Sequence, residues 1–370
     1  MDNMPVRCVN VKSEQVDPSH VALAVDAIRA GKLVALPTET VYGIAAIPGD
    51  AASEDRVRQM KGRDPARPMS FHVATPADAA ALTPRMPPGA ARLASRYWPG
   101  PLTIVVDGHQ DMTVGIRVPA NPFTQEVLAA FDQGLLLSSV NRSGHPPLLD
   151  ADSMANEIPE LDLIFDGGRP PLALSSAVVR CVGSSIEVLR EGTLDRMDLL
   201  VGAAAALVFV CTGNTCRSPM AEAIARRRIA DELGVNEDEL LQHGLLVSSA
   251  GTMAAHGIPA TDHAIQAARE IGLDLTEHRS TPTHGQFLDE ASRVYALTGS
   301  HLMGLLRERP ELNEIASTLR PDGQDIDDPF GADLAVYRST RDAIAAAVDQ
   351  RCPDIMAWVN YVTGVGRQSS

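Results

Sequence analysis

The chain has 370 residues, roughly twice the usual size of a domain, so we expect two domains that each bury a hydrophobic core. Hydrophobic residues make up 45% of the sequence and charged residues 21%, a balance that excludes a disordered or collagen-like chain. The net charge is −15 and both halves are acidic, so we expect no stable binding of nucleic acid, which needs clustered cations against phosphates.

The sequence contains no candidate for a targeting or membrane segment. No stretch approaches the roughly 18 consecutive apolar residues of a membrane span. Five cysteines, an odd number without a secretory signal, do not form a disulfide framework, so we expect reduced thiols. These features predict an unprocessed cytoplasmic protein that makes no contact with a membrane.

The first half alternates β-rich runs with helical stretches. The runs predict strands at 33–36, 102–106, 135–139 and 185–189, and the stretches predict helices at 20–30 and 123–131. We therefore expect a twisted α/β domain that is rich in strands.

Polar motifs follow several of these elements. Residues 37–43 read Pro-Thr-Glu-Thr-Val-Tyr-Gly, residues 61–63 read Lys-Gly-Arg, and residues 139–141 read Ser-Val-Asn. Taken singly, such motifs are most often solvated turns or strand-end caps. Together, cations with hydroxyl and amide groups at strand ends predict a cleft for an anionic, nucleotide-like ligand.

Six sequence blocks make the first half resemble the YrdC family of threonylcarbamoyl-AMP synthases. They are 37–43, Lys61 with Arg63, Trp-Pro-Gly-Pro-Leu-Thr at 98–103, Arg-Val-Pro at 117–119, Ser139 with Asn141, and Leu-Arg-Glu-Gly at 189–192. The resemblance implies a reaction that joins L-threonine, bicarbonate and ATP into threonylcarbamoyl-AMP and pyrophosphate, for the t6A modification of tRNA. It also implies Mg²⁺ bound with ATP, and a transfer partner in the tRNA threonylcarbamoyl machinery.

The same resemblance assigns roles to residues of the first half. The cationic residues that would neutralise the ATP phosphates and the carbamate are Lys61, Arg63, Arg117 and Arg190. The polar residues that would orient threonine and the nucleotide are Thr38, Ser139 and Asn141. The chain has Ala177 where the family has a threonine, although Ser176 before it remains as a nucleotide contact. The alternative is an RNA-binding module, because YrdC-like folds have also been regarded as binders of double-stranded RNA.

A run of small and apolar residues at 199–206 separates the two sets of elements, and we place the boundary near residue 203, with domains at 1–203 and 204–370. The second half has strand patterns at 207–210, 245–249 and 293–297, and helix patterns at 219–233, 260–271 and 334–348. Strands that alternate with helices predict a doubly wound parallel sheet.

A C-x5-R motif lies where the strand at 207–210 gives way to the next helix. The motif and its neighbours read Cys211-Thr212-Gly213-Asn214-Thr215-Cys216-Arg217-Ser218-Pro219. Gly213 is expected to allow a turn that points successive N–H groups inward, above a helix N-terminus that favours phosphate. Cys211 is expected to be a thiolate, Arg217 to form a fork onto a phosphoryl group, and Asn214 and Ser218 to hydrogen-bond the loop and the thiolate.

Such a motif is too common to decide the chemistry alone, but Asp327-Asp328-Pro329-Phe330 downstream could donate the proton that a leaving group needs. With these residues, the second half resembles the low-molecular-weight protein-tyrosine phosphatase family over about 206–365. The resemblance implies that Cys211 forms a cysteinyl-phosphate, that Asp328 acts as general acid and then as base, and that Arg217 stabilises the transition state. It implies phosphoproteins as substrates and requires neither a metal nor a cofactor.

Thr215 refines the expected substrate. Tyrosine-directed members usually carry a bulkier aliphatic residue at this position, whereas bacterial protein arginine phosphatases carry threonine, so we favour phosphoarginine over phosphotyrosine. A rival is arsenate reductase, which shares the fold and a nearly identical loop. That chemistry needs two further cysteines after the loop, and only Cys352 follows Cys216.

Overall fold

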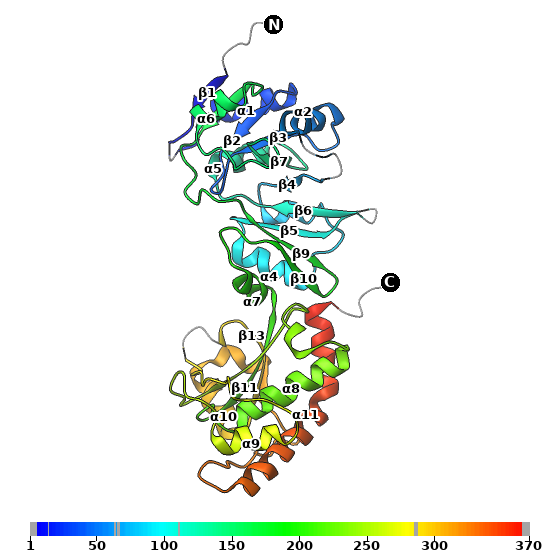
Figure 1. Ribbon diagram of the computed structural model, residues 1–370, viewed down its shortest axis with the longest axis vertical. Helices are drawn as coiled ribbons and strands as arrows, with labels where there is room; N and C mark the ends of the chain where they lie inside the picture. The colour runs from blue at the N-terminus through cyan, green and yellow to red at the C-terminus, as the bar shows by residue number, and fades with distance from the viewer. Residues whose placement is uncertain are drawn as a thin grey trace. The chain divides into compact units, whose positions relative to one another are not determined.

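A computed structural model describes residues 6–13, 15–62, 64, 67–109, 112–284 and 288–364. The chain divides into two compact units, Met1–Ala203 and Ala204–Ser370 (Figure 1). The first unit therefore ends with helix α7 (Arg196–Ala203), and the second begins just before strand β11 (Ala205–Cys211). None of the helices in the described ranges is long and apolar enough to cross a membrane.

The described residues of the first unit form a ten-stranded mixed sheet in the order β1-β8-β2-β3-β7-β4-β6-β5-β9-β10. Its strands are β1 (Arg7–Asn10), β2 (Val34–Leu36), β3 (Gly43–Ala46), β4 (Ser70–His72), β5 (Leu102–Asp107), β6 (Thr113–Arg117), β7 (Leu135–Ser139), β8 (Leu163–Asp166), β9 (Ala177–Val182) and β10 (Ser185–Arg190). Its other helices are α1 (Pro18–Arg29), α2 (Ala51–Lys61), α3 (Pro76–Ala79), α4 (Pro88–Tyr97), α5 (Pro122–Ala129) and α6 (Ala151–Glu157). This architecture confirms the predicted strand-rich α/β fold.

Alternate strand residues bury both faces of this sheet, as the two-residue period of a strand requires. Leu36 and Leu137 pack in one cluster with residues of α1 and α5. Ala35 and Leu136 pack in a second cluster with residues of α2 and α6. Because both faces are covered, the ends of β2 and β7 are held rigidly, and the motifs at 37–43 and 139–141 continue from those ends.

The described part of the second unit forms a four-stranded parallel sheet in the order β12-β11-β13-β14, so the predicted doubly wound sheet is confirmed. The further strands are β12 (Leu245–Gly251), β13 (Ala291–Ala296) and β14 (Ala316–Thr318). The helices are α8 (Arg217–Leu233), α9 (Asp262–Arg269), α10 (Gly299–Glu308) and α11 (Leu334–Thr363), with short 3-10 helices η1 (Glu237–Glu239) and η3 (Pro310–Glu314).

The helices cover both faces of the second sheet. Leu207 and Phe209 of β11 pack with α8, α9 and α11. Val208 and Val210 pack on the opposite face with α10 and η3. Strand β11 lies between β12 and β13, where the strand order reverses, and crevices at this place in a doubly wound sheet commonly hold ligands.

Helix α11 extends well beyond the predicted end at residue 348. It continues through Pro353 to Thr363, and it lies beside α8 (Figure 1). A proline inside a helix costs about 3 kcal/mol. Trp358 and Val359, both buried, lie beyond it, and each large apolar side chain contributes roughly 1.5–3 kcal/mol when buried, so packing outweighs the cost of the proline.

Candidate functional sites

Strand β11 ends at Cys211, and helix α8 begins at Arg217, so the five residues between them form a closed loop at the switch point of the sheet. Cys211 is buried, and its Sγ lies 3.0 Å from the hydroxyl oxygen of Ser218. The hydroxyl can donate a hydrogen bond to a thiolate at this distance. The bond that the sequence predicts between Ser218 and the Cys211 sulfur is therefore present.

The conformation of the loop depends on Asn214 and not, as predicted, on Gly213. Asn214 has φ +53°, in the left-handed region, while Gly213 lies outside that region. The side-chain amide of Asn214 donates to the Ser218 and Ser249 hydroxyls at 2.9 and 2.8 Å, and its side-chain oxygen Oδ1 accepts from the Thr281 N–H at 2.7 Å. An asparagine tolerates the left-handed region because its short polar side chain forms such bonds.

Arg217 closes the loop from the helix side. Its guanidinium is buried and donates to the Asp328 carboxylate at 2.6 Å and to the Ile326 carbonyl at 3.0 Å. The Asp328 side chain is 48% exposed, so it faces solvent next to the loop. Of the three residues predicted to carry the chemistry, the structure thus pairs Arg217 with Asp328, and Cys211 lies at the other end of the same loop.

The remaining predicted loop residues support the walls of the site. The sulfur of Cys216 lies 3.4 Å from the Tyr337 hydroxyl and 3.5 Å from the Thr261 hydroxyl. Thr215 accepts a backbone hydrogen bond from Thr261 at 2.9 Å, and its hydroxyl lies 3.7 Å from the Cys216 sulfur. Burial raises the pKa of Tyr337 to about 12, so its phenol stays protonated.

The sequence did not indicate the groups that hydrogen-bond Asn214 or support its partner Ser249. Ser249 donates at 2.7 Å to the carboxylate of Glu222, which lies one helical turn after Ser218 on α8. His278 Nε2 lies 2.7 Å from the Asn214 carbonyl oxygen. Burial raises the pKa of the Glu222 carboxyl and lowers the pKa of His278. The four-residue spacing of Ser218 and Glu222 was a usable signal, because it places both on one helix face.

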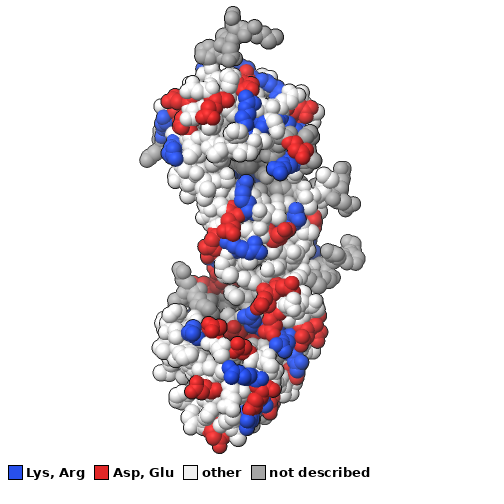
Figure 2. Space-filling view, in the orientation of Figure 1, with Lys and Arg blue, Asp and Glu red and all other residues white. Residues whose placement is uncertain are grey.

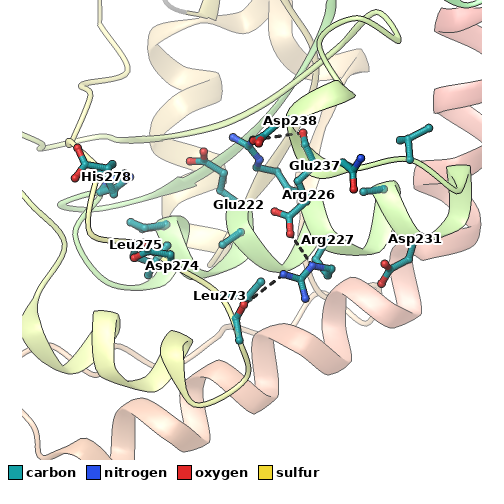
Figure 3. A pocket seen from close by; sticks show the side chains of 17 residues that line it. Glu222, Arg226, Arg227, Asp231, Glu237, Asp238, Leu273, Asp274, Leu275 and His278 are labelled. Atoms are coloured by element: carbon teal, nitrogen blue, oxygen red, sulfur yellow. Dashed lines mark hydrogen bonds and ion pairs between the residues drawn. The ribbon is translucent and has the colours of Figure 1, made fainter.

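Glu222 and His278 also line a cavity of about 880 Å³ beside α8 (Figure 3). Charged groups of both signs surround it. Arg227 donates to the Glu237 carboxylate at 2.6 Å and to the Gly272 carbonyl at 3.3 Å. The hydrogen bonds that support the loop therefore extend to a cavity on the side of α8.

A second candidate site lies in the first unit, where a cavity of about 240 Å³ gathers residues from distant motifs. Five of its lining residues were predicted: Thr38, Arg117, Ser139, Ser176 and Arg190. Arg190 donates to the Ser176 carbonyl at 2.9 Å and to its hydroxyl at 3.2 Å. Thr103, which ends the block at 98–103 and had no role assigned, places its own hydroxyl 3.0 Å from that of Ser176.

Lys61, Ser139 and Asn141 form one hydrogen-bonded group beside this cavity. The buried Lys61 ammonium donates to the Asn141 side-chain oxygen at 2.9 Å, to the Asn141 carbonyl at 3.0 Å, and to the Ser139 carbonyl. The Ser139 hydroxyl donates to the same Asn141 side chain at 2.6 Å. Arg63, predicted as a further phosphate ligand, lies outside the described residues.

Arg117 and Thr38 are engaged with the 37–43 segment itself. The Arg117 guanidinium donates to the Glu39 carboxylate at 2.6 Å and to the Thr40 hydroxyl at 2.8 Å. The Thr38 hydroxyl donates to the Val41 carbonyl at 2.6 Å. Part of the Arg117 charge is therefore already balanced by a carboxylate, a partner that sequence reasoning did not assign.

His72 is a further lining residue that the sequence did not single out. It lies at the end of β4, and its Nδ1 is 3.1 Å from the Ser70 carbonyl oxygen. Burial, and to a smaller extent the positive charge of Arg117, lowers the pKa of His72 to about 3. The imidazole is therefore neutral. Separately, no group of three His, Cys, Asp or Glu side chains that could hold a metal occurs within the described ranges.

Comparison with known proteins separates the chain into the same two parts. Residues 26–192 match the family model described as Telomere recombination, and residues 206–360 match the one described as Low molecular weight phosphotyrosine protein phosphatase. In the first half the chain is 33% identical over 203 residues to a putative threonylcarbamoyl-AMP synthase of Mycobacterium tuberculosis, which covers 51% of this chain and 92% of that protein. It is also 31% identical to the threonylcarbamoyl-AMP synthase of Pyrococcus abyssi, and it spans only 60% of that protein's length.

In the second half, the chain is 38% identical over 149 residues to the protein-arginine-phosphatase of Geobacillus stearothermophilus, which covers 39% of this chain and 91% of that protein. Among solved structures, a crystal structure of a YwlE mutant from Bacillus subtilis is 31% identical, covers 41% of this chain and 99% of its own, and has a TM-score of 0.37.

Proposed function

Because the chain belongs to the threonylcarbamoyl-AMP synthase family in its first half and to the low-molecular-weight phosphatase family in its second, we propose that it is a bifunctional enzyme. The first unit makes threonylcarbamoyl-AMP and pyrophosphate from L-threonine, bicarbonate and ATP. The second unit hydrolyses phosphoarginine in proteins.

The contact between Cys211 and Ser218 at the base of the loop carries the phosphatase proposal. The Cys211 thiolate attacks phosphorus, the bond to the leaving group breaks, and Asp328 gives that group its proton. Water then attacks the cysteinyl-phosphate while the Asp328 carboxylate takes a proton from it, and the sulfur–phosphorus bond breaks to release phosphate. Arg217 turns from Asp328 to the equatorial oxygens when the phosphoryl group binds.

The covalent intermediate gives this proposal its test. Rapid acid quenching during turnover is expected to show one phosphoryl group on the peptide that contains Cys211, by mass spectrometry. The Cys211→Ser variant is expected to keep the wild-type circular dichroism spectrum and to lose hydrolysis. Full activity of this variant would overturn the mechanism.

Thr215 supports phosphoarginine as the substrate, together with the 38% identity to a protein-arginine-phosphatase. In this proposal its hydroxyl, which lies 3.7 Å from the Cys216 sulfur, meets the group beyond phosphorus. Thr215→Ile removes that hydroxyl and adds apolar bulk that a flat phenol still tolerates, whereas Thr215→Ser keeps the hydroxyl. The ratio of kcat/KM for phosphoarginine over phosphotyrosine is expected to fall about 10–200-fold in the isoleucine variant and much less in the serine variant. A wild type that prefers phosphotyrosine would overturn this assignment.

The synthase proposal depends on the gathering of Lys61, Ser139 and Asn141 beside the cavity that Arg190 and Ser176 line. A buried lysine and an exposed arginine near hydroxyl and amide groups suit a nucleotide phosphate and a carbamate. Mg²⁺ bound with ATP would supply positive charge against the pyrophosphate that leaves. The lining hydroxyls orient the nucleotide and threonine, and the product passes to an enzyme that transfers the threonylcarbamoyl group to tRNA.

Pyrophosphate release that depends on both threonine and bicarbonate tests this half. Lys61→Ala is expected to lose most of it, because a buried anion would lose its counter-charge at about 2–5 kcal/mol. Cys211→Ser is the matched control, since it lies in the other unit. Near-normal release by Lys61→Ala would overturn the assignment.

The RNA-binding alternative gains little from the surface. On the face drawn in Figure 2, basic and acidic side chains are interspersed over both units. An RNA groove would instead gather cations along its length. A pure binding module would release no pyrophosphate in the assay above.

A further inference from the structure

His301 joins the phosphate loop to the N-terminus of helix α10. Its Nε2 lies 2.8 Å from the hydroxyl oxygen of Thr212, the residue that follows Cys211. Its Nδ1 lies 2.8 Å from the hydroxyl oxygen of Thr298, which caps α10. The imidazole is buried and spans 89 residues of sequence to reach the loop.

One assignment of the protons around Thr298 satisfies all of these contacts and leaves the ring proton of His301 on Nε2. The Thr298 hydroxyl oxygen accepts from the backbone N–H of His301 at 3.2 Å and lies 2.8 Å from the Ser300 hydroxyl. With Ser300 as donor, both lone pairs of that oxygen are used, so Thr298 donates its own proton to Nδ1. The ring proton then sits on Nε2 and is donated to Thr212.

Burial favours the neutral imidazole that this arrangement needs. Burial lowers the pKa of His301, and the positive charge of Arg217 from α8 lowers it further. Asp328 and Asp325, from the segment before α11, act in the opposite direction. An imidazolium would have no acceptor for the Thr298 proton, so protonation would break the chain of bonds.

We propose that His301 is a positioning residue of the phosphatase site, which holds the Thr212 hydroxyl and thereby fixes the loop before the phosphoryl group binds. This inference rests on the proposed phosphatase function. The Thr212 carbonyl oxygen is held separately by the Met253 N–H at 2.9 Å. Thr212 is thus fixed by both its backbone and its side chain, and a loop ordered in advance loses less freedom when it binds an anion.

Two amide substitutions separate this role from a structural one. In His301→Gln the amide can reach the Nε2 position and donate to Thr212, whereas in His301→Asn it reaches only the Nδ1 position and bonds Thr298. The inhibition constant for inorganic phosphate and the kcat/KM are expected to change less than about threefold in the glutamine variant. In the asparagine variant the inhibition constant is expected to rise and the kcat/KM to fall, each on the order of tenfold, which is the loss expected for one preorganised hydrogen bond.

The matched test comes from the other end of the bond. Thr212→Val is expected to show the same losses of phosphate affinity and kcat/KM as His301→Asn, and Thr212→Ser is expected to stay near wild type. The double variant Thr212→Val/His301→Asn is expected to lose no more than either single variant. If His301→Asn does not fold, the two Thr212 variants decide alone. Phosphate binding by calorimetry on the full chain gives the same comparison even if the wild type hydrolyses no phosphoprotein. The proposal would be overturned if His301→Asn kept wild-type phosphate affinity and kcat/KM while His301→Gln lost them. It would also be overturned if the losses of the Thr212→Val and His301→Asn variants added up in the double variant.

Discussion

Arg217 holds the carboxylate that the proposed reaction needs as an acid. The two groups are 2.6 Å apart, with side-chain exposures of 5% for Arg217 and 48% for Asp328. An ion pair with one half-exposed partner is weak, because water competes for the carboxylate. A phosphoryl dianion can therefore take the guanidinium and release Asp328 toward the leaving group.

Asp328→Asn tests that division of roles. The amide oxygen still accepts from Arg217, but the side chain has no proton to give and cannot activate water. We expect kcat for substrates with poor leaving groups to fall about 10²–10⁴-fold, and kcat for an activated aryl phosphate to fall much less. Steady-state kinetics over a series of leaving groups is the measurement. An equal fall for every leaving group would instead indicate a loss of geometry, and a wild-type rate would move the acid to Asp327.

Asn214 combines a left-handed backbone with three side-chain hydrogen bonds, and two substitutions separate these contributions. Asn214→Gly loses the bonds and keeps the backbone freedom. Asn214→Ala loses the bonds and adds strain of about 1–2 kcal/mol. We expect alanine to be the less stable variant in urea unfolding followed by Trp358 fluorescence, although alanine usually stabilises relative to glycine through the unfolded chain. The reverse order would show that the loop relaxes out of the left-handed region.

At the level of elements, length alone did not decide what could be predicted: the three-residue strand β2 was predicted within 33–36, whereas the ten-residue helices α4 and α10 were not. Strand β11 and helix α8 have strong patterns, whereas β14 and α3 span three and four residues and carry too little period to detect. Helix α11 was predicted to stop at residue 348, although its burial continues to the end of the helix. The local sequence pattern does not show whether tertiary packing is strong enough to offset the cost of a proline inside a helix.

The same limit divides the site residues. Those contiguous in sequence, from Cys211 to Ser218, could be assigned from their spacing. His278 and His301 touch the loop from 64 and 89 residues away, so no local pattern indicates them. Gly213 was expected to allow the turn, while the left-handed residue in the structure is the neighbouring Asn214, whose side chain finds two partners in distant segments, Ser249 and Thr281.

Pro353 gives an element-scale prediction. It lies within α11 on an exposed position, and the helix continues beyond it to buried Trp358. Pro353→Ala restores a backbone donor and removes the ring, so we expect a gain of about 1–3 kcal/mol in the free energy of unfolding of the second unit. Urea unfolding followed by Trp358 fluorescence, in a Trp98→Phe background, measures it. A loss of stability would mean that α11 bends at Pro353 in a way that its packing requires.

For the whole molecule, the two tryptophans of the chain give independent signals. Trp98 belongs to the first unit and Trp358 to the second, and both are buried. Trp358→Phe leaves fluorescence from the first unit alone, and Trp98→Phe leaves it from the second. Unfolding of each unit can therefore be followed in the full chain, without assuming that either unit folds by itself.

These signals test the effect of His72 on stability. Its pKa is about 3 in the folded protein against 6.5 for a free histidine, so between these values the unfolded chain binds the extra proton. Stability of the first unit therefore falls as the pH drops below about 6.5, by up to ~1.4 kcal/mol per pH unit from this group. His72→Asn does not titrate and can still donate to the Ser70 carbonyl, so the Trp98 transition is expected to lose that part of its pH dependence between about pH 6.5 and 5. The Trp358 transition, measured in the same variant, is expected to keep the wild-type pH dependence. Equal slopes for the Trp98 transition with and without His72 would show that the imidazole is protonated in the folded unit.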